Sequence, residues 1–350
     1  MTENGPAPMD PLPRRPGLVT PGRVVALVIA LIGFYVVWPS LVALSASFDG
    51  LRHMNPLWFV VMIVFEAASY ASIWALIALC IGTHRYFLIG ASQISGNAVS
   101  KIVPGGAPVG AALQYRLLVA GGLDAARIGT GLTAVSIINL ATLFAMPVFP
   151  LPAILLGIVV VDRGLALGVW LGVAAFVLLV GGGAILLLAN RPIENVGRMI
   201  QWILNAVRRK KPRVKDLPER LTSERDTIRT TLGKRWGQAI LRSSGNVVFD
   251  YLALLAAVHA TGAKPHASLV LLAYVASVVL GMIPITPGGL GFVEAGLTAM
   301  LVLAGMTTAQ ATLATLAYRL VSYWLPVAAG PVAYALYRRR AQKWAARRQA

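Results

Sequence analysis

Three carboxylates and one arginine lie inside long apolar runs of this sequence. They are Glu66, Asp250, Glu294 and Arg319. A charged side chain near the centre of a bilayer costs at least about 2.5–3.5 kcal/mol, so it normally faces a partner or a water-filled cavity. A purely structural interpretation pairs Arg319 with either Asp250 or Glu294. Alternatively, an acid in this setting can carry protons for coupling or receive a cationic headgroup.

The triplet Pro-Gly-Gly interrupts two further apolar stretches near their middles, at residues 104–106 and 287–289. Proline lacks the amide donor and paired glycines leave helical geometry easily, so each stretch should form two half-helices of about 15 residues. Because such pieces are too short to cross a bilayer, they predict re-entrant hairpins over 88–121 and 267–305. Broken backbone of this kind is tolerated where it lines a protein-walled or wet cavity.

Each new half-helix begins with unpaired amides and the positive end of its dipole. Two such ends facing each other from opposite sides would form an anion site suited to a lipid phosphate. The predicted substrate-binding residues lie in and beside the breaks: Asn97, Ser100, Lys101, Pro104, Gly105, Gly106, Pro287, Gly288, Gly289 and Gly291. Charge compensation or coupling is expected from Glu66, Asp250, Glu294 and Arg319. Two alternatives stay open: Lys101 as an orientation anchor at the cytoplasmic interface, and Glu294 as a cap on its half-helix.

The amino-acid composition indicates whether these elements lie in water or in a membrane. The chain has 350 residues, 57% hydrophobic and 13% charged, with a mean hydropathy of +0.72. A soluble protein spends roughly a quarter of its residues on charge, so the sequence predicts a polytopic membrane protein. The single cysteine, Cys80, excludes a disulfide framework. No nucleophile elbow, phosphate-binding loop or metal-ligand spacing occurs, so we expect no catalytic residue, no metal and no cofactor.

The predicted fold is all-α, with six full spans and two re-entrant hairpins, or about eight spans by hydropathy alone. The full spans are predicted at 24–44, 57–81, 128–147, 165–189, 239–261 and 311–336. The resulting organisation is a disordered tail 1–23, a first membrane half 24–189, a basic loop 190–236, a second membrane half 237–337 and a basic tail 338–350.

Basic residues orient this arrangement. The loop 190–236 carries 13 of them and the segment after Tyr337 carries 6. Placing both termini and the loop in the cytoplasm puts 27 basic residues there, against only Arg52, Arg163 and Lys264 outside, as the positive-inside rule requires. We therefore expect a multi-pass membrane protein with cytoplasmic termini.

The basic loop has two interpretations. Its first part, from Val196 to Val207, spaces apolar residues like an amphipathic helix, and Arg208-Arg209-Lys210-Lys211 follows. Such a segment would bind an anionic lipid surface. A solvated linker that only obeys the orientation rule fits equally well. We expect no nucleic-acid partner, because no compact basic fold presents these charges, although the net charge is +18.

The chain also repeats itself at an offset of about 183 residues. Pro104 precedes Gly122 by the interval that separates Pro287 from Gly305, and Glu66 and Asp250 stand at nearly matching distances upstream. On the predicted topology, the span holding Glu66 runs inward and the span holding Asp250 runs outward. This predicts an inverted repeat, the plan on which many secondary transporters place a substrate site near the membrane midplane.

Three motifs resemble the transmembrane region of bacterial lysylphosphatidylglycerol synthetases, also called multiple peptide resistance factors, and of their stand-alone flippase-like relatives. The motifs are Asn97-x-x-Ser100-Lys101-x-x-Pro104-Gly105-Gly106, Pro284-x-Thr286-Pro287-Gly288-Gly289-Leu290-Gly291-x-x-Glu294 and Arg319-x-x-x-Tyr323-Trp324-x-Pro326. The likeness covers roughly residues 20 to 340. It implies a membrane domain that moves lipids between leaflets, with an aminoacylated phospholipid, a glycolipid or a polyprenyl phosphate as cargo. The chain leaves no room for the aminoacyl-transfer domain of the synthetases, so we do not expect that activity.

The leading functional hypothesis is a lipid flippase whose partner is a membrane phospholipid or a lipid-linked headgroup. One alternative is an integral-membrane transferase acting on a lipid phosphate, with Glu294 or Asp250 as base. A second alternative is a non-transporting partner of a lipid-modifying enzyme. Assembly as a homo-oligomer is compatible with each.

Overall fold

The computed structural model describes residues 48–103, 106–148, 233–282 and 286–349, with isolated positions between 174 and 226. Every regular element in this part of the chain is a helix, which confirms the all-α fold class. The predicted tail 1–23 and span 24–44 lie outside the described residues, as do nearly all of the span 165–189 and most of the loop 190–236.

Within the described residues, three helices are long and apolar enough to cross a membrane: Pro56–Ile81, Ala125–Ala145 and the continuous segment Thr308–Arg340. They match the predicted spans 57–81, 128–147 and 311–336. The predicted span 239–261 is also one helix, Trp236–Ala260, of 25 residues. Its first turns carry polar side chains, so it is less apolar than the other three. The chain is a multi-helix membrane protein.

The first half of the described chain consists of α2 (Phe48–His53), α3 (Pro56–Ile81), α4 (Tyr86–Ile102), α5 (Ala107–Ala120), α6 (Ala125–Ala145) and η1 (Met146–Val148). Helix α3 begins after Asn55, whose side chain accepts a hydrogen bond from the Leu57 amide at 2.9 Å. It ends at Gly82, which adopts a φ of 72°. Asp124 caps α6 in the same way as Asn55 caps α3. The break between α4 and α5 falls where the sequence predicts it.

The second half consists of η2 (Gly233–Arg235), α11 (Trp236–Ala260), α12 (Ala267–Met282), η3 (Pro287–Gly289), α13 (Phe292–Leu303), α14 (Thr308–Arg319), the π-helix η4 (Leu320–Trp324) and α15 (Leu325–Gln349). At the second break, Gly288, Gly289 and Gly291 have φ values of 57°, 72° and 79°. Residues with a Cβ rarely adopt this left-handed region. The glycines of the motif are therefore required by the backbone path.

The order of elements in the first half recurs in the second. Helices α3 and α11 have 26 and 25 residues, α4 and α12 have 17 and 16, and α5 and α13 have 14 and 12. Left-handed glycines occur at matching joints, with Gly82 and Gly262 after the first helix of each series. Gly122 and Gly305 follow the third helix of each series.

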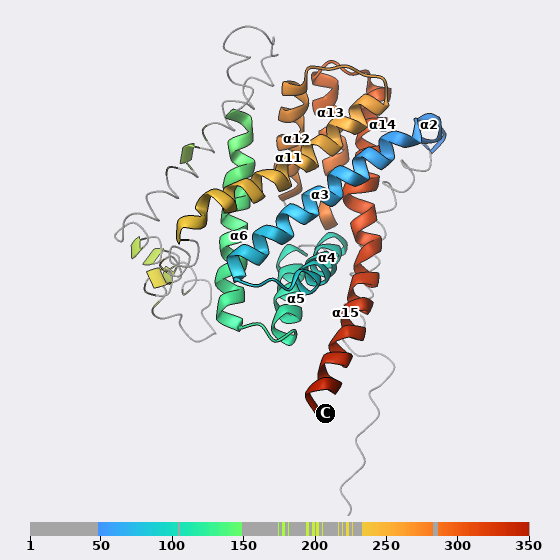
Figure 1. Cartoon of the computed structure of the whole chain (residues 1–350). Coiled ribbons are helices and arrows are strands. Elements are labelled where there is room, and N and C mark those ends of the chain that lie inside the picture. The colour runs from blue at the N-terminus through green and yellow to red at the C-terminus, as the bar shows by residue number, and fades with distance from the viewer. Residues whose placement is uncertain are drawn as a thin grey trace, which may run out of the picture.

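Helices α3 and α11 pack side by side and run in opposite directions (Figure 1). The α4–α5 hairpin lies toward one end of the molecule and the α12–α13 hairpin toward the other, while α15 runs along α4. Each hairpin has its own apolar core. Leu88 and Leu118 belong to a buried cluster around α4 and α5, whereas Tyr274 and Leu297 belong to a second cluster around α11 to α14.

Candidate functional site

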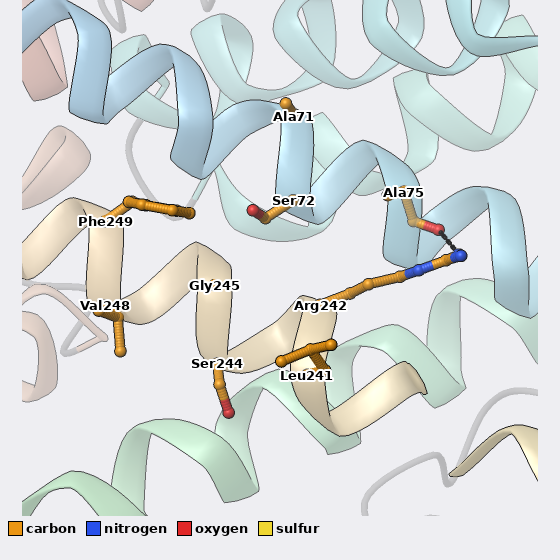
Figure 2. A pocket seen from close by; sticks show the side chains of 9 residues that line it. All are labelled: Ala71, Ser72, Ala75, Leu241, Arg242, Ser244, Gly245, Val248 and Phe249. Atoms are coloured by element: carbon orange, nitrogen blue, oxygen red, sulfur yellow. Dashed lines mark hydrogen bonds between the residues drawn. The ribbon is translucent and has the colours of Figure 1, made fainter. Parts of the chain in front are cut away.

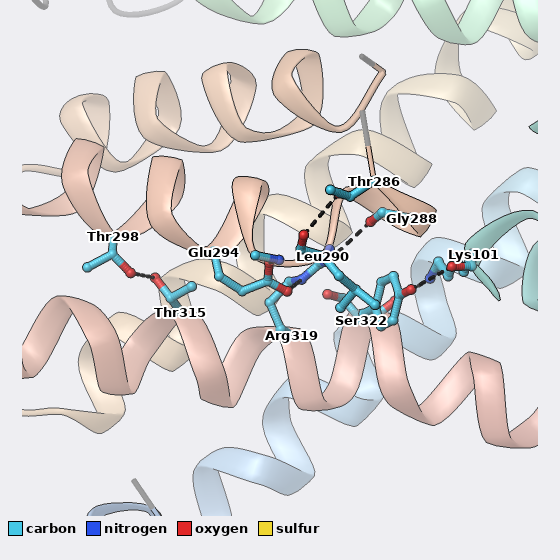
Figure 3. A network of polar contacts seen from close by, with 11 residues as sticks. Lys101, Thr286, Gly288, Leu290, Glu294, Thr298, Thr315, Arg319 and Ser322 are labelled. Atoms are coloured by element: carbon cyan, nitrogen blue, oxygen red, sulfur yellow. Dashed lines mark hydrogen bonds and ion pairs between the residues drawn. The ribbon is translucent and has the colours of Figure 1, made fainter. Parts of the chain in front are cut away.

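The tips of the two hairpins touch (Figure 3). A Cβ atom placed on Gly288 would lie 2.7 Å from the carbonyl oxygen of Lys101, near the end of α4, and would also collide with Tyr323. The same carbonyl accepts a hydrogen bond from the Tyr323 hydroxyl at 2.7 Å. Three segments, α4, η3 and η4, therefore converge at one point. Pro104 and Gly105 lie outside the described residues.

The Lys101 side chain binds a backbone carbonyl whose α-helical donor position is occupied by a proline. Its Nζ donates a hydrogen bond to the carbonyl oxygen of Ser322 at 2.8 Å. In a regular helix this oxygen would accept from the residue four positions later, but that residue is Pro326, which has no N–H. The surrounding π-helix is a geometry found frequently at functional sites. The ammonium group thus supplies a donor that the helix backbone lacks.

Glu294 occupies the start of the second half-helix. One carboxylate oxygen accepts a hydrogen bond from the Gly291 amide at 2.7 Å. The other accepts from Nε of Arg319, also at 2.7 Å, and the two side chains are only 14% and 11% exposed. Arg319 also donates to the Gly288 carbonyl at 3.3 Å. Of the two structural pairings that the sequence left open for Arg319, the structure forms the one with Glu294, which is also the cap on α13.

The Tyr323 ring contacts both cations. The Arg319 guanidinium lies 4.2 Å from the ring centroid and the Lys101 ammonium 5.0 Å from it. The negative face of an aromatic ring attracts cations. A tyrosine in the motif Arg319-x-x-x-Tyr323 therefore holds the two positive charges in one place and also links the first hairpin to η4 through its hydroxyl.

Lys101, Arg319, Glu294, Glu66 and Asp250 together form one charged cluster. Glu66 lies on α3 and Asp250 on α11. The two carboxyl groups lie within hydrogen-bonding reach of each other, and Lys101 is close enough to interact electrostatically with both. Glu66 is 7% exposed, and its Oε2 atom has no hydrogen-bond partner. Asp250 differs because both of its oxygens accept tyrosine hydroxyls, from Tyr274 at 2.9 Å and Tyr318 at 2.8 Å.

Sequence reasoning missed Tyr274 and Tyr318, and it assigned no role to Ser322. Tyrosine is compatible with an apolar run, so its position alone does not identify it as the donor to a buried acid. The available signal was indirect: Asp250 is buried in an apolar run and needs donors, and Tyr318 directly precedes Arg319. The sequence could indicate the need for a donor but not which hydroxyl meets it.

The remaining predicted residues lie on the two hairpins. Ser100 donates to the carbonyl of Asn97 at 2.8 Å, so its hydroxyl is engaged within α4. Two buried side-chain atoms lack partners, Oδ1 of Asn97 and Nε2 of Gln114. Gly106 is the buried residue before α5, and no side chain caps that helix. On the second hairpin, the Gly289 amide donates to the Thr286 carbonyl at 3.1 Å.

The described residues form two largely apolar grooves. One, of about 570 Å³, lies between α3 and α11 and includes Ser72, Gly245 and Arg242, whose Nη1 donates to the Ala75 carbonyl at 2.7 Å (Figure 2). The other, of about 660 Å³, lies between α13 and α14. Glu294 contributes to its lining together with four threonines, Thr298, Thr308, Thr312 and Thr315.

The structure thus combines membrane-spanning helices with two broken hairpins whose tips meet beside a set of buried charged side chains, which defines a polytopic membrane protein with an internal polar site. The chain belongs to the family of the lysylphosphatidylglycerol synthase TM region, which it matches over residues 23–330. This confirms the resemblance drawn from the break motifs. A comparison with curated proteins gives no match. Among the described residues, no group of three acidic, histidine or cysteine side chains could hold a metal ion.

Proposed function

We propose that this protein is a lipid flippase that moves a phosphate-bearing lipid between the leaflets of the bacterial cytoplasmic membrane. The observation that carries the proposal is the meeting of two hairpin tips, from opposite ends of the molecule, around Lys101, Arg319 and three buried acids. A charged cavity at the junction of two half-helices is the usual location of the substrate site in secondary transporters. Membership of the family is consistent with a lipid-related role in the membrane.

The arrangement of the two halves supports an inverted repeat. If α3 and α11 cross the bilayer in opposite directions, the hairpin that follows each one enters from a different side. This corresponds to six full spans plus two re-entrant hairpins, with both termini cytoplasmic. Rocking of one half against the other would then open the cluster to each leaflet in turn.

Glu294 takes the place that a lipid phosphate would occupy. Its carboxylate engages both the Gly291 amide and Arg319, which together match an anion-binding helix N-terminus. A phosphate would compete with Glu294 for these donors. On the first hairpin, Lys101 and the unpartnered Nε2 of Gln114 offer further donors, near Asn97 and Ser100. The acyl chains would stay in lipid while the headgroup crosses.

The grooves suit the apolar part of such a lipid. Arg242 bonds a neutral backbone carbonyl, which leaves its positive charge for a lipid phosphate, and the basic loop that leads into α11 would attract anionic lipid to the same end. The groove between α13 and α14 leads from Glu294 along its threonines. A headgroup could follow this polar line while its chains remain outside.

Purified protein in liposomes that contain fluorescent phosphatidylglycerol or phosphatidylethanolamine tests the proposal. The dithionite-accessible fraction of the label reports the leaflet, and mass spectrometry reports whether the lipid is altered. We expect label movement with unchanged lipid mass. Glu294→Gln should bind phosphatidylglycerol more tightly yet transport it more slowly, because the competing charge is gone. Arg127→Gln, an exposed charge at the start of α6, is the matched control. A changed lipid mass would indicate the transferase alternative, and an unmoved label in every case would refute the flippase.

A further inference from the structure

If all three acids of the charged cluster were ionised, they would carry one more negative charge than its two cations can neutralise. Glu294 is paired with Arg319. Of the described residues in the cluster, the remaining ionisable groups are two acids, Glu66 and Asp250, and one base, Lys101. The Lys101 ammonium donates to the neutral carbonyl of Ser322. Two adjacent carboxylates in a buried site repel each other strongly, and such pairs commonly share one proton.

The hydrogen bonds indicate which of the two acids carries that proton. Asp250 accepts two tyrosine hydroxyls, which stabilise its ionised form. Glu66 has an unpartnered Oε2, is 7% exposed and lies within hydrogen-bonding reach of Asp250. Carboxylates only accept, so a hydrogen bond between these two groups needs a proton on one of them. Glu66 is the group that can donate it to Asp250.

Among the described residues, the titratable groups that face this pair come from four helices. They are Tyr70 on α3, Lys101 on α4, Tyr274 on α12 and Tyr318 on α14. Arg319, the other cation near Lys101, is neutralised by Glu294. Lys101 is therefore the cation that responds to the charge of the pair.

We propose that Glu66 and Asp250 hold a single exchangeable proton and that its uptake and release are coupled to lipid movement. The inference rests on the proposed flippase function. When Glu66 gives its proton to water, the pair carries two negative charges and attracts the Lys101 ammonium. Lys101 then leaves the Ser322 carbonyl, and one of the contacts that hold the first hairpin against η4 is lost. Reprotonation returns Lys101 to Ser322 and closes the contact.

Proteoliposomes of the full chain test the coupling. Vesicles of phosphatidylethanolamine and phosphatidylglycerol contain fluorescent phosphatidylglycerol, and valinomycin with equal potassium on both sides holds the membrane potential at zero. With one proton per lipid, the steady-state ratio of label between leaflets should shift by about tenfold for each unit of pH difference. Reversing the gradient should reverse the shift. In Glu66→Gln, which fixes the neutral form and therefore the closed contact of Lys101 with Ser322, label movement should be slower and should not respond to the gradient.

Infrared difference spectroscopy of the purified protein tests the proton site without any transport. We expect a pH-dependent carboxylic-acid C=O band that is lost in Glu66→Gln and retained in the control Asp124→Asn, which changes an exposed carboxylate at the start of α6. If wild-type protein moves no label, the flippase proposal fails while the band still tests the proton site. If it moves label with the same leaflet ratio at every gradient, the coupling is refuted, even where Glu66→Gln does not fold. A band that persists in Glu66→Gln refutes the site.

Discussion

The two hairpin tips share a backbone plan but differ in how their helix ends are used. At the first tip, α5 begins at Ala107 without any side-chain cap, and the charged residue that precedes the break is the cation Lys101. At the second tip, α13 begins with its Gly291 amide bonded to Glu294, which also neutralises Arg319. The first tip therefore offers donors, while the second already holds its own anion.

The two hairpins thus share a backbone geometry, and they differ in the charge that their side chains place at the helix end. A Pro-Gly-Gly break generates an exposed helix end wherever it occurs. Whether that end can take a ligand depends on the third residue of the helix, which is Glu294 in α13 and Val109 in α5. Substitutions at one tip at a time should therefore have unequal effects.

Removing the cation at the second tip should have the largest effect. Arg319→Met leaves Glu294 buried without its partner, which should lower the free energy of unfolding by about 3–5 kcal/mol. Chemical denaturation in detergent micelles measures the loss. The double variant Arg319→Met with Glu294→Gln should recover most of it, because no unpaired charge remains. Equal losses in the single and double variants would show that the pair does not contribute as described.

The contact between the tips should be the next most sensitive. Gly288→Ala forces a Cβ into a left-handed backbone and against Lys101 and Tyr323, which should cost about 2–4 kcal/mol from backbone strain and overpacking together. We expect lower stability and slower label movement in liposomes. Gly129→Ala in α6 is the control, since a Cβ there meets nothing within 4 Å. The same behaviour in both variants would argue against tip contact.

The first tip should tolerate change better. Lys101→Met removes the charge-assisted hydrogen bond to the Ser322 carbonyl, a loss of about 1.5–3 kcal/mol. Lys101→Arg keeps a donor and should lose less. Denaturation of the two variants beside the wild type measures the order. If Lys101→Met were as stable as wild type, the lysine would not join α4 to η4.

The smallest effect concerns the donors to Asp250. Tyr318→Phe deletes one hydroxyl and should lower stability by about 1 kcal/mol, with a similar loss for Tyr274→Phe. Because both hydroxyls serve the same carboxylate, the double variant should deviate from the sum of the singles. Strict additivity in the denaturation midpoints would mean that the two tyrosines act independently of Asp250.

Much of the fold follows from local patterns. The hairpin predicted over 88–121 is formed by Tyr86–Ile102 and Ala107–Ala120, and the one over 267–305 by Ala267–Met282 and Phe292–Leu303. These boundaries depend on prolines, glycines and the lengths of apolar runs, all of which act within a few residues. The predicted anion site at α13 stays a prediction, since its Gly291 amide is engaged by Glu294. The alternative interpretation of Glu294 as a cap is the one the structure forms.

The amino-acid sequence alone determined that the chain enters a membrane, where its helices break and that its buried acids need compensation. Those features depend on the free energy of transferring each segment from water into the membrane and on the backbone conformations open to each residue. Both are set by residues that are close together in the sequence. Only the tertiary structure decided that Arg319 pairs with Glu294, that two tyrosines bind Asp250 and that Lys101 reaches Ser322. Lys101 and Ser322 are 221 positions apart, so no local pattern encodes their contact, and only the packing of all the helices brings them together.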